Sequence, residues 1–167
     1  YLDMDDDLRK YFKFKRDIHE RGHEPEKVEE IFEQRSKDSE LFIKPQMQFA
    51  DIIFTLEPAI NKVFLNDYEY KKNIPLKLVF VTSDSQNTLS LRKTLVSVCG
   101  LHVDITHDSK KHKVMLTIMG DVSSEDISIA SNILFPELID FLDYKPIFSG
   151  GMLGVMQLVT LAHIYSS

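Results

Sequence analysis

The chain has 167 residues, 43% of them apolar and 28% charged, and its formal net charge at pH 7 is -6. These values suit a globular protein of one ordinary domain or two small ones. They exclude a general nucleic-acid binder, because such a protein presents a broad basic surface to the phosphate backbone.

Cysteine content and hydropathy narrow the class further. Cys99 is the single cysteine, so an internal disulfide is excluded, which fits a reducing compartment, and we expect the cytoplasm. The longest apolar stretch, residues 150–165, is shorter than the roughly 20 residues that a membrane-spanning helix needs, and it contains Gln157 and His163. We therefore predict a buried helix there and no membrane partner.

A short strand and a charged helix open the chain. YLDM, residues 1–4, is partly apolar and β-prone, which predicts a strand inside a sheet. The run DDDLRKYFKFKRDIHERG predicts a helix, because its aspartates suit the N-terminal end and Gly22 suits termination. Since the sequence starts at Tyr1 and not at methionine, we also expect a fragment of a longer protein.

The rest of the chain alternates helical and strand-like patterns. Pro25 favours the start of a second helix that ends near Ser36, and Pro45 predicts a loop between that helix and the next strand. The later predictions, in chain order, begin with a strand in ADIIFTL (50–56), a strand pair or an irregular segment at 61–72, and a strand at 74–83. Residues 87–100 are compatible with a helix or with a strand entering the sheet, and we favour the helix. A hairpin at 101–120 with its turn at 108–111, a helix capped by Ser123 or Ser124, and a last helix from Gly151 to Tyr165 complete the chain.

Interleaved strands and helices predict an α/β fold, with α+β as the alternative, built on a mixed β-sheet with flanking helices. Charge-dense helices dominate before Pro58, whereas strands become frequent after it. We therefore predict two domains, at residues 1–57 and 58–167.

The helix at residues 5–21 concentrates positive charge in an acidic protein. Helical spacing places four charged side chains near one face, namely Arg9, Lys13, Arg16 and Glu20. One interpretation is a solvated helix held by weak ion pairs such as Asp17–Arg21. The other is a phosphate clamp made of Lys13, Arg16 and Arg21, because guanidinium groups bind phosphate in a bidentate manner.

Several rare elements recur here in a known order. The pattern K-x-x-R-D-x-x-E-R-G-[HY], then a helix, F-I-x-P-Q and A-D-I-[IV], is read in KFKRDIHERGH, FIKPQ and ADII. Residues 1–56 therefore resemble the phosphoribulokinase and uridine kinase family. The second half is similar, more weakly, to the carboxyl-terminal part of phosphoribulokinases through GLHVDI, MGDVSSEDI and SGGMLGVMQLVTL.

The resemblance implies the last strand and the lid of a P-loop kinase-like fold, followed by a C-terminal α/β domain. In such an ATP-dependent kinase, Lys13, Arg16 and Arg21 would be the catalytic residues of the lid, with Arg16 and Arg21 contacting ATP phosphates. Asp17 and Glu20 would orient these cations. The acceptor would be a hydroxyl of a sugar phosphate or nucleoside.

The phosphate-binding motif G-x-x-x-x-G-K-[ST] does not occur in this sequence. We therefore expect ATP and Mg²⁺ to be held by an upstream kinase half of the same polypeptide, and this chain to be inactive alone. The alternative function is a non-catalytic dimerisation, regulatory or ligand-binding module derived from the same family, with a homodimer as its assembly.

Three other groups of residues receive structural interpretations. The histidines at 102, 107 and 112 do not converge by strand alternation, so we expect no metal. Cys99 is predicted to be a packed core residue. The glycines of SGGMLG are interpreted as a tight turn that lets the last helix pack closely against the sheet, because they lack the spacing of a phosphate loop.

Overall fold

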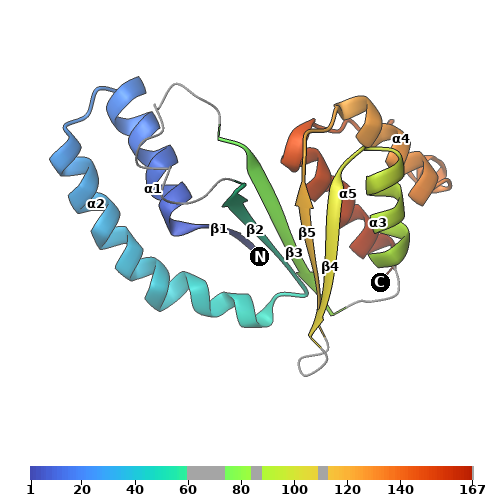
Figure 1. Cartoon of the computed structure of the whole chain (residues 1–167), viewed down its shortest axis with the longest axis horizontal. Helices are drawn as coiled ribbons and strands as arrows, with labels where there is room; N and C mark the ends of the chain where they lie inside the picture. The colour runs from blue at the N-terminus through green and yellow to red at the C-terminus, as the bar shows by residue number, and fades with distance from the viewer. Residues whose placement is uncertain (60–73, 84–87, 109–112, 167) are drawn as a thin grey trace. The chain divides into compact units, whose positions relative to one another are not determined.

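The computed structural model describes residues 1–59, 74–83, 88–108 and 113–166. The chain divides into two compact units, residues 1–76 and 77–167, and each is described by itself (Figure 1). The segment at 61–72, for which a strand pair or an irregular segment was expected, lies outside the described residues.

The first unit begins with a parallel strand pair. Strand β1 (Leu2–Met4) pairs with β2 (Ile52–Pro58), in a register that places Leu2 opposite Phe54 and Met4 opposite Leu56. Two parallel neighbours need a long crossover between them, and the intervening helices provide it. The two strands predicted from YLDM and ADIIFTL are therefore confirmed.

Helix α1 (Asp6–Phe14) continues without a break into the π-helical segment η1 (Lys15–Glu20). The Asp5 carboxylate caps its start by accepting hydrogen bonds from two backbone N–H groups of the first turn. Gly22 follows its end with a φ of 70°, a conformation that glycine adopts without steric cost. The predicted cap and terminator are both present.

A second helical stretch is longer than predicted. Helix α2 (Pro25–Asp38) runs on into a π-helical segment, η2 (Ser39–Ile43), and a 3-10 helix, η3 (Lys44–Phe49), so the predicted loop is wrong. Pro45 lies in the first turn of the 3-10 helix, where a missing N–H removes no helical hydrogen bond. It therefore starts a new helical segment and does not break one.

The apolar core of the first unit is formed by α1 together with residues of β1, of β2 and of the segment at 74–76. Leu8, Tyr11 and Ile74 form a buried cluster. Partly buried apolar side chains pack against it: Met4, Phe12, Leu56 and Leu76. Because residues 74–76 share this core, the compact unit extends to Leu76, whereas the domain division expected after residue 57 stays a prediction.

The second unit contains an antiparallel sheet in which β5 (Lys113–Met119) pairs with both β3 (Leu76–Thr82) and β4 (His102–Asp108). Strands β4 and β5 pair over their whole length, which confirms the predicted hairpin. Residues 109–112, which include most of its predicted turn, lie outside the described part of the chain.

Three helices cover one face of this sheet: α3 (Thr88–Ser97), α4 (Ser124–Leu134) and α5 (Gly151–Ser166) (Figure 1). A short 3-10 turn, η5 (Leu138–Phe141), lies between the last two helices in the sequence. Alternate strand residues are buried, as expected for a sheet with one covered face: Leu78, Phe80, Val103, Val114, Leu116 and Ile118.

The sequence predictions for this unit agree with the structure. The helix favoured for residues 87–100 is α3, and the last predicted helix is α5. Ser123 is the cap of α4, because its hydroxyl accepts a hydrogen bond from the Asp126 N–H at 3.0 Å. With parallel and antiparallel strands and flanking helices, the α/β fold class is confirmed. No helix in the described ranges is long and apolar enough to cross a membrane.

Gly154 permits close packing around the first turns of α5. A Cβ atom at this position would collide with the carbonyl oxygen of Ser149 and lie 3.1 Å from Cγ1 of Ile127 on α4. The glycine at 154 therefore serves close packing, and its contact involves the preceding turn and a neighbouring helix. The expected role of the glycine-rich segment in packing the last helix against the sheet stays a prediction.

Replacing Gly154 with alanine should lower the free energy of unfolding of the chain by about 2 kcal/mol, because the added methyl group overpacks this contact. Urea denaturation followed by circular dichroism measures the change. Leu153→Ala is the control, since Leu153 is exposed and its loss should change stability by less than about 0.5 kcal/mol. If Gly154→Ala stabilised the protein instead, as a strain-free glycine replacement in a helix does, the packing argument would be wrong.

Candidate functional site

Within the first unit, the two helical stretches form a hairpin that contains a pocket of about 720 Å³. Lys10 and Glu29 join α1 to α2 by an ion pair of 2.9 Å between Nζ and Oε1, and Figure 1 shows the two stretches connected by the turn after η1. The pocket is lined by Met4, Arg9, Phe12, Lys13, Lys15, Arg16, Glu20, Phe32, Arg35, Ser36, Ser39 and Ile43.

Positive charge dominates the pocket wall. Five of its side chains are cations and Glu20 is its one carboxylate, although the chain as a whole is acidic. The four residues predicted to share a helix face all line it: Arg9, Lys13, Arg16 and Glu20. A low-dielectric wall focuses such a local field, so the pocket attracts anions in spite of the net charge of the protein.

Asp17 organises the cations next to the pocket. It is only 7% exposed. Arg16 binds it through two hydrogen bonds, Nε to Oδ1 at 2.7 Å and Nη2 to Oδ2 at 3.0 Å. Arg21 donates from Nη1 to Oδ1 at 3.3 Å, and Lys13 Nζ lies 3.9 Å from Oδ2. One buried carboxylate therefore holds all three cations that the sequence singled out.

The hydrogen bonds from Arg16 hold the pKa of Asp17 below its ordinary value of 3.8, against the opposing effect of burial. The same contact raises the pKa of Arg16. Both groups are therefore charged at neutral pH, and the guanidinium is kept in one orientation by its bidentate partner.

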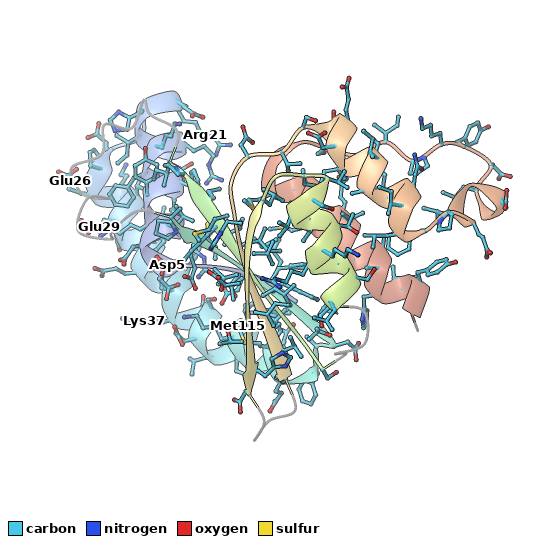
Figure 2. All side chains as sticks on the ribbon, turned by 45° about the vertical axis from the view of Figure 1, so that its right-hand side comes forward. Asp5, Arg21, Glu26, Glu29, Lys37 and Met115 are labelled. Carbon is cyan, nitrogen blue, oxygen red and sulfur yellow. The ribbon has the colours of Figure 1, made fainter. Side chains whose placement is uncertain are left out.

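The structure separates the three predicted residues by position. Lys13 and Arg16 line the pocket, whereas Arg21 is exposed at the helix end beside the turn and reaches the group through Asp17 (Figure 2). The contacts of Asp17 have the geometry expected of a residue that orients cations. The catalytic roles of Lys13, Arg16 and Arg21 stay predictions.

Sequence reasoning missed four polar residues of the pocket: Lys15, Arg35, Ser36 and Ser39. Three of them belong to the second helical stretch, which the turn at Gly22 folds back beside the first. Arg35 and Ser39 have i,i+4 spacing, which places them on one helix face, and that spacing is the signal that could have indicated them.

Salt bridges tie the strand end to the first helical stretch and the first stretch to the second. Arg9 donates to Asp3 at 2.7 Å and to Asp6 at 2.9 Å. Lys44 binds Asp6 at 3.0 Å and also Glu40, and these two hydrogen bonds raise the pKa of Lys44. The bridge through Asp6 therefore links the first turn of α1 to the end of the second stretch.

The other candidates from the sequence behave as structural residues. Nε2 of His102 lies 3.1 Å from Oδ2 of Asp104, two residues further along β4, while His112 is outside the described residues. Across the described ranges, no three His, Cys, Asp or Glu side chains gather in a way that could hold a metal ion. Cys99 is buried, and burial, reinforced by Asp126, raises its pKa to about 11.

The geometry defines a cation-lined pocket in a helical hairpin that follows a strand. Residues 1–62 match the model of the Phosphoribulokinase / Uridine kinase family. The resemblance inferred from the motifs of residues 1–56 is thereby confirmed for this segment.

Individual relatives agree with the family match. The chloroplastic phosphoribulokinases of Arabidopsis thaliana and Triticum aestivum are each 38% identical to this chain over 59 residues, which is 35% of this chain and 15% of the plant protein. The phosphoribulokinase of Synechocystis sp. is 34% identical over 59 residues, or 18% of its length. The matched part is thus less than a fifth of each relative. The weaker likeness of the second half to phosphoribulokinases stays a prediction.

Asp17 should make the stability of the chain depend on acid pH. Its pKa is lower in the folded than in the unfolded state, so its contribution is complete above the ordinary value of 3.8 and is lost as the pH falls through the lower folded-state value. Asp17→Asn should therefore lower stability at pH 7 and flatten its decline below about pH 4.

Urea denaturation at a series of pH values measures this effect. Glu33→Gln is the matched control, because Glu33 is an exposed carboxylate on α2 with no hydrogen bond or ion pair to any described residue. Parallel pH profiles for Asp17→Asn and the unaltered chain would contradict the central role assigned to Asp17.

Proposed function

We propose that this chain supplies the lid and an accessory domain of a larger ATP-dependent phosphotransferase of the phosphoribulokinase and uridine kinase kind. The observation that carries the proposal is the group formed by Lys13, Arg16 and Asp17 at a cation-lined pocket inside the segment that matches the family. The substrate class is a sugar phosphate or nucleoside with a free hydroxyl.

The residues of the hairpin would act by electrostatics. ATP supplies the phosphoryl group, and its phosphates carry charge that Arg16 and Lys13 neutralise from the pocket wall while Arg21 does so from the helix end. Asp17 keeps the Arg16 guanidinium aligned before the ligand arrives, which reduces the entropy lost on binding. The aromatic rings of Phe12 and Phe32 line the same pocket and exclude water from the charged contacts.

The remaining parts of the catalytic apparatus would come from the upstream half of the same polypeptide. The sequence contains no P-loop motif, so the loop that cradles the phosphates, its Mg²⁺ contact and the base that takes the acceptor proton are assigned to that half. This chain alone would be inactive. We keep the cytoplasm as the proposed compartment, although the plant relatives are described as chloroplastic.

A ligand-binding module is the second candidate, because the pocket lies wholly within residues 1–76 and needs no other part of the chain for its lining. Such a module would bind a phosphorylated metabolite without turning it over. The two functions differ in whether the longer chain, which includes the upstream half, turns the ligand over.

The test uses this chain and a longer chain that includes the upstream half. We expect the longer chain to transfer phosphate from MgATP to a sugar phosphate, and Arg16→Gln to lower its turnover at least 100-fold, because a lost transition-state charge contact costs about that much. Lys27→Gln is the control, since Lys27 is an exposed cation of α2 outside the pocket lining.

Unchanged turnover in the Arg16 variant would refute the lid assignment. Tight calorimetric binding of MgATP by the 167-residue chain alone, without turnover in the longer one, would favour the ligand-binding module.

A further inference from the structure

The cations of the pocket fall into two groups according to their partners. Arg9 and Arg16 are engaged by carboxylates through short hydrogen bonds, and Lys13 lies near Asp17. Lys15 and Arg35 line the same pocket, and the side chain of neither makes an ion pair or hydrogen bond with any described residue. The pocket therefore contains two cations whose donors are all available.

Cations that are paired with a carboxylate have fewer free hydrogen-bond donors for an incoming anion than unpaired cations have. The Nε and Nη2 groups of Arg16 already point at Asp17, so a bidentate contact with a new oxygen through these atoms would first break two charge-assisted hydrogen bonds. Arg35 has its full guanidinium fork free of described residues, and Lys15 its three ammonium donors. An incoming anion thus gains most from Lys15 and Arg35.

The serines of the second helical stretch complete the donor set. Ser36 donates its hydroxyl to the carbonyl oxygen of Phe32 at 2.8 Å, so it can only accept. The Ser39 hydroxyl makes no hydrogen bond to any described residue and can donate. A phosphate monoester dianion has only acceptor oxygens, so Lys15, Arg35 and Ser39 match it in chemistry, whereas a ligand with donors would need carboxylates.

The charge balance agrees with a dianion. Arg9 is set aside because two carboxylates, Asp3 and Asp6, bind it. Arg21 is counted with the cations of the pocket because it shares Asp17. Five cations then face two carboxylates, which leaves an excess of three positive charges, enough for a dianion: Lys13, Lys15, Arg16, Arg21 and Arg35 against Asp17 and Glu20. The apolar side chains of Met4, Phe12, Phe32 and Ile43 line the same pocket and can accept the organic part of a ligand.

We propose that Lys15, Arg35 and Ser39 are the primary contacts of a phosphate dianion in this pocket, with Arg16 held in place by Asp17 beside them. The proposal rests on the proposed function and adds residues to it, since the phosphate belongs either to a sugar phosphate or to the end of a nucleotide. Arg16 then neutralises charge from one side, while Lys15 of the first helical stretch and Arg35 and Ser39 of the second fix the phosphate.

Binding of three probes to the 167-residue chain tests this proposal: inorganic phosphate, ribose 5-phosphate and MgATP, measured by calorimetry at constant ionic strength. We expect Lys15→Gln and Arg35→Gln each to weaken binding at least tenfold, because a charge-assisted hydrogen bond contributes about that much. Arg35→Lys should give an intermediate loss, since it keeps the charge and loses the fork.

Lys37→Gln is the matched control. Lys37 lies on the same helix and is exposed, it has no ion pair with a described residue, and it does not line the pocket. Its replacement removes the same charge and should change affinity less than twofold. Circular dichroism of each variant checks that the fold is retained.

The pattern across the probes identifies the source of the phosphate. Tenfold losses for ribose 5-phosphate support a sugar phosphate, and losses confined to MgATP support a nucleotide. The proposal is overturned if the unaltered chain binds none of the three, if Lys37→Gln weakens binding as much as Arg35→Gln does, or if the Lys15 and Arg35 variants bind normally.

The phosphate contacts and the kinase lid can fail independently, and the two experiments distinguish these failures. Loss of turnover in the Arg16 variant of the longer chain together with normal phosphate binding by the Arg35 variant would reject only the phosphate contacts. Retained turnover after Arg16→Gln together with the expected binding losses would reject the kinase lid and leave a phosphate-binding pocket.

Discussion

The candidate site depends on one buried carboxylate. A charge as poorly exposed as that of Asp17 is costly unless it is paired and hydrogen-bonded. Here the bidentate contact with Arg16 provides most of that compensation, and Arg21 and Lys13 add to it. The result is a cluster in which three cations share one anion, so it remains positive although every member has a partner. Because the buried carboxylate must be paired, it keeps three cations close together, and an acidic protein thereby presents a stable positive surface.

The hairpin turns this cluster into a pocket. Helix α1 and η1 end at Gly22, whose positive φ reverses the chain at no steric cost, and α2 returns beside them through the Lys10–Glu29 pair. The return brings a second set of donors next to the first. Lys44 strengthens the far end of the second stretch by binding Asp6 at the start of α1. The pocket wall is thus made by two helical stretches that are linked at both of their ends.

Local rules predicted most of the elements. Period-two alternation in LKLVFVT and in the hairpin indicated strands, and Asp5, Ser123 and Gly22 indicated helix ends, because capping depends on a few neighbouring residues. The prediction failed at residues 39–49. There Pro45 suggested a break, but a proline in the first turn of a 3-10 helix is compatible with a chain that stays helical. The composition of that segment does not distinguish the two cases.

The sequence by itself determined the fold class, the basic face of the first helix, and the resemblance of its opening segment to the phosphoribulokinase and uridine kinase family. These properties depend on spacing within one element or on motif order. Only the tertiary structure decided that Arg35 and Ser39 line the same pocket as Arg16, and that Asp17 is buried among three cations. Contacts across a hairpin depend on where the turn ends and how two helices pack, and helical periodicity carries no information about either.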